Sequence, residues 1–157
     1  MRSCSDVRDH LIQKGISHEI VHLPSSSSTA LLAADALGVP VGEVVKSLVF
    51  LLDDERPLLA LVPGDTTVDT DALARDRHVS QVALAKGEQV LELTGYRPGA
   101  VPPCALETDV PVIADPRVFV PDVVYCGAGT TTTMLKIRSA DLEALIKPRK
   151  LPIAQRR

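Results

Sequence analysis

The sequence has few aromatic residues, few cysteines and no long apolar run, and each shortage argues against a class of protein. Phe, Tyr and Trp make up 3% of the chain and Trp is absent, so a broad base-stacking surface is not expected. Cys4, Cys104 and Cys126 lie far apart in the sequence. This spacing disfavours a disulfide framework or a zinc site and favours small buried hydrophobic residues. No apolar run approaches the roughly 20 residues that span a bilayer, and the polar N-terminus does not resemble a signal peptide. We therefore expect a cytoplasmic protein with no membrane partner.

Length and charge bound the domain organisation. A chain of 157 residues with 45% hydrophobic and 24% charged residues fits one globular domain with a substantial core. No repeat or internal linker divides the sequence, so we expect a single domain over residues 1–157. The net charge is −3, yet residues 147–157 hold five Lys and Arg and no acid. This basic C-terminal tail could guide a polyanion or could be a solvated tail, which is the commoner case.

Helix and strand patterns alternate along the chain and predict a single α/β domain with a mixed, partly antiparallel central sheet flanked by helices. The first helix, which Ser3 or Ser5 can cap and Gly15 can end, places Cys4, Val7, Leu11 and Ile12 on one face. Further helices are expected over 30–37, 41–45, 70–76, 86–93 and 139–146, the last with Ser139 as its cap. Strands or extended segments are expected over 16–23, 46–52, 58–62, 79–84, 110–114, 118–120, 123–126 and 130–137.

The strand expected over 46–52 is the centre of this pattern. Its alternation places Lys46, Leu48, Phe50 and Leu52 on one face. Ser47, Val49 and Leu51 lie on the other face. Both faces are mainly apolar, which is typical of an interior strand covered on both sides. The ammonium of Lys46 must therefore reach water or an anion. The commoner outcome is that the stem lies along apolar surface and the charge reaches solvent.

Residues 94–103, Thr-Gly-Tyr-Arg-Pro-Gly-Ala-Val-Pro-Pro, form the second informative stretch. Its glycines and prolines predict a fixed, irregular loop that continues neither helix nor sheet. Glycine lets a backbone approach a ligand closely, and converging N–H groups can stabilise an oxyanion. The simpler interpretation is a helix C-cap followed by an ordinary turn.

Other catalytic patterns are missing. The sequence contains no Gly-x-Ser-x-Gly elbow, Walker loop or dinucleotide-binding glycine motif. The acidic pairs at 53–54 and 69–71 lie in expected turns or helix caps, and His18 and His22 have no partner at metal-ligand spacing. The candidate site therefore consists of the strand over 46–52, here called the lysine strand, and the loop over 94–103, here called the glycine loop.

These two motifs together resemble a known family. The segment 44–50, Val-Val-Lys-Ser-Leu-Val-Phe, is followed about fifty residues later by 94–99, Thr-Gly-Tyr-Arg-Pro-Gly, and then by Pro103. With the Ala-Leu-Gly-Val-Pro segment at 36–40 and the Asp141-Leu142 pair, the pattern resembles the YbaK/prolyl-tRNA-synthetase-associated domain family. The family comprises aminoacyl-tRNA editing domains, and the resemblance covers nearly the whole chain.

The resemblance implies a small pocket between the lysine strand and the glycine loop. It assigns Lys46 to the acylated 3′ end of tRNA and the backbone from Gly99 to Pro103 to the aminoacyl ester. Lys46 and Gly99 are the expected catalytic residues. The expected substrate-binding residues are Ser47, Gly95, Tyr96, Ala100, Val101, Pro103, Thr132 and Thr133. In this chain Ala100 stands where many members have a second glycine, and no acid lies between Asp122 and Asp141, where some members have one.

The implied function is trans-editing, the hydrolysis of the aminoacyl ester of a mischarged tRNA, with no metal, cofactor or covalent enzyme intermediate. An aminoacyl ester is already activated, so positioning and oxyanion stabilisation can suffice. The expected partners are the mischarged tRNA and an aminoacyl-tRNA synthetase. The alternative is a non-catalytic relative with the same fold that binds tRNA or a protein and has no need of Lys46.

Overall fold

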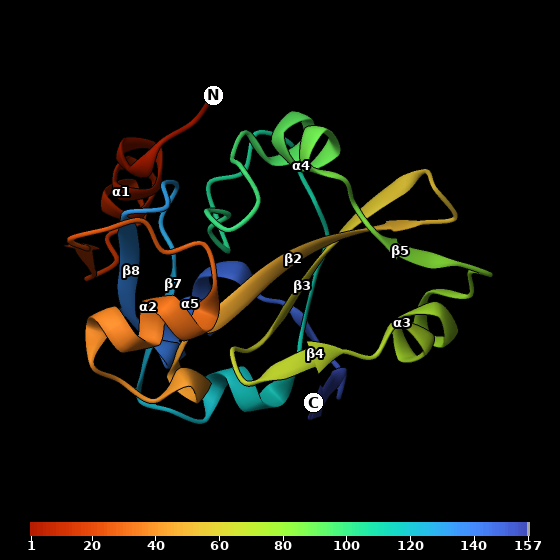
Figure 1. Ribbon diagram of the computed structural model, residues 1–157. Helices are drawn as coiled ribbons and strands as arrows, with labels where there is room; N and C mark the ends of the chain where they lie inside the picture. The colour runs from red at the N-terminus through yellow and green to blue at the C-terminus, as the bar shows by residue number, and fades with distance from the viewer. Residues whose placement is uncertain (157) are drawn as a thin grey trace.

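A computed structural model describes residues 1–156, in which helices surround two main β-sheets, of five and three strands, and a third sheet has two strands (Figure 1). The helices are α1 (Cys4–Gln13), α2 (Ala30–Leu37), α3 (Thr70–Arg77), α4 (Gly87–Thr94) and α5 (Ser139–Ile146), with short 3-10 helices η1 (Val41–Glu43) and η2 (Pro116–Phe119). The strands are β1 (Glu19–His22), β2 (Val45–Leu52), β3 (Arg56–Pro63), β4 (Thr66–Val68), β5 (Val82–Leu84), β6 (Val112–Ala114), β7 (Val123–Gly127), β8 (Thr133–Arg138), β9 (Arg149–Lys150) and β10 (Ala154–Arg156). None of the helices in this part of the chain is long and apolar enough to cross a membrane.

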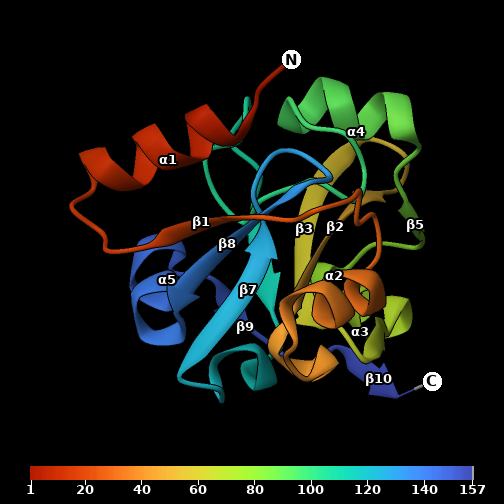
Figure 2. The same cartoon turned by 60° about the vertical axis from the view of Figure 1, so that its left-hand side comes forward.

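The strand pairing confirms a mixed sheet. The larger sheet has the order β5-β2-β3-β6-β9, in which β2 pairs antiparallel with β3 and β5, and β3-β6 and β6-β9 are parallel. The smaller sheet, β1-β8-β7, is antiparallel. A parallel bridge between Val44 and Tyr125 connects the start of β2 to β7. Figure 2 shows the smaller sheet beneath α1, with α2 beside β2.

Both faces of β2 are covered, as its alternating pattern predicted. Val45, Val49 and Leu51 belong to the main core, together with residues of α1, β7 and β8. Phe50 and Leu52 belong to a second core on the opposite face, where Leu73 and Ile153 are also buried. The strand therefore separates two apolar layers and fixes the direction of every side chain along it.

Several local predictions were wrong, among them the strand expected over 130–137, which begins only at Thr133. Ile12 was placed on the buried face of the first helix, but it is 62% exposed, whereas Val7 and Leu11 are fully buried. Residues 118–120 were expected to be extended, but η2 occupies Pro116–Phe119. The Asp115 side chain accepts from Arg117 N and caps η2, and Pro116 suits its first turn because it lacks an N–H.

The C-terminal region contributes strands to two sheets, the larger sheet and the two-stranded sheet. Ser139 is the first residue of α5, not its cap, and its hydroxyl donates to the carbonyl oxygens of Phe119 and Asp122. After α5, β9 pairs with β6 and β10 pairs with β4. The two basic residues of β9 make ion pairs: Arg149 with Asp76, and Lys150 with Glu143.

Candidate active site

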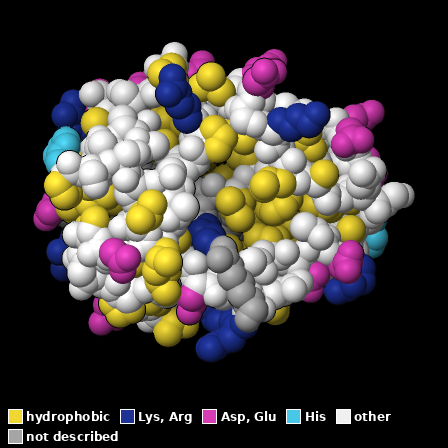
Figure 3. Space-filling view, in the orientation of Figure 1, with side chains coloured by type: hydrophobic (Ala, Val, Ile, Leu, Met, Phe, Trp, Pro, Cys, Tyr) yellow, Lys and Arg dark blue, Asp and Glu magenta, His cyan; other side chains and the backbone are white. Residues whose placement is uncertain are grey.

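A cavity of about 600 Å³ opens beside the first half of β2. Figure 3 shows a hollow near the centre of the face drawn, bordered on one side by hydrophobic side chains. The lining comes from the segment around the start of α2, from β2, from the β4 region and from loops: 27–31, Ala33, 44–48, Phe50, Gly64, Thr67, Val68, Thr70, Leu84, Gly99, Val101, Gly127 and Met134.

The cavity exists because one edge of β2 is only partly paired. β3 pairs with β2 over its whole length, but on the other edge the described residues provide only β5, opposite Phe50–Leu52, the Ala85 N–H, which donates to Val49 O, and the bridge at Val44. Backbone groups alternate between the two edges of a strand. Val49 O accepts from Ala85 N–H on the edge of β2 that faces away from β3. The backbone N–H and C=O of Ser47, two residues earlier, therefore face the same edge, toward the cavity.

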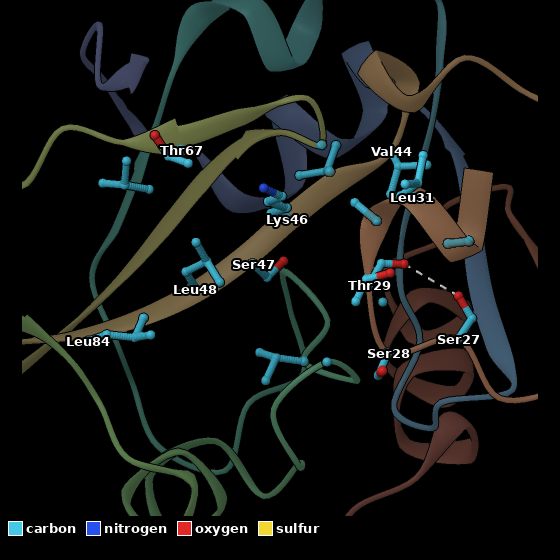
Figure 4. A pocket seen from close by; sticks show the side chains of 18 of the residues that line it. Ser27, Ser28, Thr29, Leu31, Val44, Lys46, Ser47, Leu48, Thr67 and Leu84 are labelled. Atoms are coloured by element: carbon cyan, nitrogen blue, oxygen red, sulfur yellow. Dashed lines mark hydrogen bonds between the residues drawn. The ribbon is translucent and has the colours of Figure 1, made fainter. Parts of the chain in front are cut away.

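Lys46 lies in the middle of this cavity, between Thr67 on one side and Thr29 and Leu31 on the other (Figure 4). Its ammonium is half-buried and donates to the carbonyl oxygen of Thr66 at 2.6 Å. Thr66 is itself buried, and its hydroxyl donates to Pro63 O at 2.7 Å. The charge is therefore held inside the cavity by a backbone carbonyl.

The hydroxyl of Ser47 is buried and has no hydrogen-bond partner among the described residues. Leaving such a group unpaired costs about 1–3 kcal/mol, and buried polar groups are normally satisfied. Ser47 also lines the cavity, so a polar group of a bound molecule could supply the missing partner.

The glycine loop closes the cavity on the side of α2. Gly99 has φ +83°, and a Cβ at this position would lie 2.9 Å from the carbonyl oxygen of Ser28. A second close approach lies behind the loop, where a Cβ at Gly127 would lie 2.5 Å from Val101 O. Gly99 and Gly127 thus allow three backbone segments to meet around the cavity.

Four of the predicted site residues line the cavity together: Lys46, Ser47, Gly99 and Val101. The other six lie outside its lining among the described residues: Gly95, Tyr96, Ala100, Pro103, Thr132 and Thr133. The roles assigned to all ten remain predictions.

Tyr96 packs the loop from inside. Its ring is fully buried, its hydroxyl donates to Ala105 O at 2.8 Å, and burial raises its pKa to about 12. Gly95 is the left-handed C-cap of α4. The hydroxyl of Thr133 is bonded to that of Thr130 at 2.7 Å, and Thr132 is exposed.

Sequence reasoning missed the α2 side of the cavity and the β4 region. In the sequence, residues 24–28 indicate a polar loop and either Ser28 or Thr29 can cap the next helix; in the structure Thr29 caps α2 by accepting from Leu32 N. No spacing in the sequence indicates that this cap faces the lysine strand. The same holds for Thr67 and Thr70.

The chemistry of the cavity is set by Lys46 within a mainly apolar lining. Lys46 is the one charged residue among the described residues that line it. Burial raises the pKa of Cys104 to about 12 and raises that of Cys126 further, so neither is a thiolate nucleophile at neutral pH. Among residues 1–156, no three His, Cys, Asp or Glu side chains gather where a metal ion could be held.

Comparisons with known proteins point to one family. The family model of the aminoacyl-tRNA editing domain matches residues 25–145. The chain is 26% identical over 140 residues to the uncharacterized protein YwhH of Bacillus subtilis strain 168, covering 89% of this chain and 88% of that protein. It is 33% identical over 129 residues to the proline–tRNA ligase of the same organism, covering 82% of this chain but 22% of the ligase. A crystal structure described as a candidate trans-editing enzyme for prolyl-tRNA synthetase has a TM-score of 0.89 and 31% identity, with 99% of this chain and 98% of that chain covered.

Proposed function

The chain belongs to the aminoacyl-tRNA editing domain family, and we propose that it hydrolyses the ester bond of a mischarged tRNA in trans. One observation carries the proposal: Lys46 and the Gly99 loop, more than fifty residues apart in sequence, line the same cavity. The similarity to proline–tRNA ligase and to the candidate trans-editing enzyme makes mischarged tRNAPro the first substrate to test. It also makes prolyl-tRNA synthetase the first partner to test. Both would place the protein in the cytoplasm.

In the proposed complex the 3′-terminal adenosine enters the cavity beside β2. The ammonium of Lys46 attracts a phosphate or ribose oxygen as a point charge. The Ser47 hydroxyl, which is buried without a partner, pairs with a polar group of the aminoacyl moiety. The ester carbonyl lies against the backbone around Gly99.

The reaction depends mainly on the positioning of the ester and the attacking water. Water adds to the ester carbonyl, the bond to the ribose oxygen breaks, and the ribose hydroxyl and the free amino acid leave, with the proton of water passing to the ribose oxygen. The reactants are positioned by the cavity, and its apolar walls strengthen each polar contact within it. In this proposal the protein supplies neither a covalent nucleophile nor a metal.

The lining also favours a class of amino acid. No acid contacts the cavity among the described residues that line it, so a cationic side chain would be buried without a counter-charge beside Lys46. Leu48, Phe50 and Met134 instead provide apolar contact. We propose that the removed amino acid has an uncharged side chain.

Release of labelled amino acid from a panel of mischarged tRNAs tests the proposal. The native protein should hydrolyse at least one tRNAPro carrying a neutral amino acid, with EDTA present, and should leave lysyl-tRNA intact. The Lys46→Ala variant should lose most of this activity, while Lys14→Ala, which removes an exposed lysine at the end of α1, should keep it. If the native protein binds tRNA but clears none of the panel, the chain is a binding relative and the proposal fails.

A further inference from the structure

The carbonyl that holds Lys46 belongs to a very short strand. Thr66 begins β4, which has three residues and pairs only with β10 among the described strands. A two-stranded pair is marginal by itself. The position of the Lys46 ammonium, 2.6 Å from Thr66 O, therefore depends on what holds β10.

The pairing of β4 with β10 leaves the Thr66 carbonyl turned toward Lys46. Asp69 N donates to Ile153 O at 2.7 Å, and Thr67 is opposite Gln155 two residues along the ladder. Because bonded pairs recur at every second residue of an antiparallel ladder, Thr67 and Gln155 form the next bonded pair. Thr66, one residue away, faces the opposite edge, where its carbonyl accepts from Lys46.

β10 is held by one buried carboxylate. Asp115 is 1% exposed, and its Oδ2 accepts from Ile153 N at 3.0 Å and from Ala154 N at 2.8 Å. Its Oδ1 accepts from Arg117 N at 2.9 Å and Arg117 Nε at 3.2 Å, and the same guanidinium donates to Ala154 O. Asp115 follows β6 in the core of the larger sheet, where its N–H donates to Leu61 O at 3.0 Å.

We propose that Asp115 is a positioning residue for Lys46, acting through β10 and the Thr66 carbonyl of β4. The strand β10 lies outside residues 25–145, which the family model matches. A buried anion tied to a rigid sheet fixes β10, β10 fixes β4, and β4 presents a fixed acceptor to a flexible side chain. Holding an ammonium in one place matters because misplacement of a substrate-binding group lowers the rate steeply.

The test separates β10 from β4 by changing a residue that is not in the cavity lining. Gln155→Pro removes the N–H that pairs with Thr67, whereas Gln155→Ala keeps it and serves as the matched control, since the Gln155 side chain is exposed. The activity readout rests on the proposed function. We expect Gln155→Pro to lower kcat/KM about tenfold or more relative to Gln155→Ala, and Asp115→Asn to lower it in the same direction.

A double-mutant cycle distinguishes positioning from general loss of structure. If β10 acts through Lys46, Gln155→Pro has little further effect in the Lys46→Ala background. Equal fold losses in both backgrounds would overturn the proposal, as would native activity in a Gln155→Pro protein whose β4 amide protons have lost protection.

A readout without tRNA separates this inference from the proposed function. In lysine-15N-labelled protein, the Lys46 ammonium protons should exchange slowly with water in the native chain and in Gln155→Ala, and rapidly in Gln155→Pro. Unchanged exchange in Gln155→Pro would overturn the inference even if the native protein hydrolyses tRNA. If the Lys46 ammonium protons exchange rapidly in Gln155→Pro but the native protein hydrolyses no tRNA, the proposed function fails and the positioning of Lys46 stands.

Discussion

The backbone of Gly99 lies directly against that of Ser28, so that a Cβ at Gly99 would lie 2.9 Å from the Ser28 carbonyl oxygen. Gly99 also has φ +83°, a conformation that L-residues other than glycine rarely adopt. The contact joins the loop after α4 to the segment before α2, the two sides of the cavity that lie far apart in sequence.

Gly99→Ala should therefore lower both stability and activity. Left-handed strain and the contact with a backbone carbonyl together should cost about 2–3 kcal/mol of unfolding free energy. Gly15→Ala is the control, because Gly15 has φ +69° with nothing within 4 Å of its added Cβ, and should cost about 1 kcal/mol. Urea unfolding and tRNA deacylation measure the two effects. Equal stability losses in both variants would show that the approach to Ser28 is not tight.

Ser47→Ala should separate activity from stability. The Ser47 hydroxyl is buried without a partner in the described part of the chain, so its removal should leave the unfolding free energy unchanged or raise it by about 1 kcal/mol. Activity should fall, because the hydroxyl is proposed to pair with the substrate. A marked loss of stability would contradict this interpretation.

Thr94→Val is the matched control for a satisfied hydroxyl. Thr94 is fully buried, its Oγ1 donates to Val90 O at 2.7 Å, and the same oxygen accepts from Tyr96 N at 3.1 Å. Leaving Tyr96 N unpaired, and removing the hydroxyl's bond to Val90 O, should cost about 1–3 kcal/mol. If Thr94→Val lowers the unfolding free energy and Ser47→Ala does not, the Ser47 hydroxyl does not contribute to stability.

The central strand was the most predictable element because burial imposes a strict pattern on it. The alternation of Lys46–Leu52 located both apolar faces, and the glycines and prolines of 94–103 located an irregular loop. Ile12 was misplaced because periodicity identifies a helical face but not its width. Residues 118–120 were misplaced because β-branched valines favour strands locally, while the Asp115 cap and Pro116 favour a helical turn.

Half of the cavity could not be predicted because it depends on pairing between distant segments. β4 and β10 have three residues each, too few to show a recognisable sequence pattern, and each is defined by its pairing with the other. A helix cap at Ser28 or Thr29 was predictable, but the position of Thr29 opposite Lys46 follows from the close contact of Gly99 with Ser28. Such contacts are properties of the folded chain and leave no spacing signal in the sequence.

Arg97→Ala should weaken tRNA binding in a salt-dependent way. Arg97 is exposed two residues before Gly99, which lines the cavity, and no ion pair is found for it among residues 1–156. Loss of one phosphate contact should reduce the slope of log K against log salt by about 1. Arg8→Ala is the control, since Arg8 is exposed on α1 beside Asp9. Filter binding over a salt series measures both slopes, and an unchanged slope for Arg97→Ala would place the RNA elsewhere.

Asp115 should make stability sensitive to acid. Burial alone would raise the pKa of this carboxyl, but hydrogen bonds from Arg117, Ala154 and Ile153 outweigh it and hold the pKa below its usual 3.8. A lowered pKa in the folded state means that the stabilisation is complete above the unfolded-state pKa and is lost as the pH falls through the folded-state value. Asp115→Asn should thus cost about 3 kcal/mol at neutral pH and progressively less below pH 4. Urea unfolding from pH 7 to pH 2 should show the two proteins converging, whereas Asp35→Asn, at an exposed position of α2, should follow the native curve throughout. Parallel curves for the native protein and Asp115→Asn would mean that the carboxylate charge does not hold β10, since the stability difference would then be independent of ionisation.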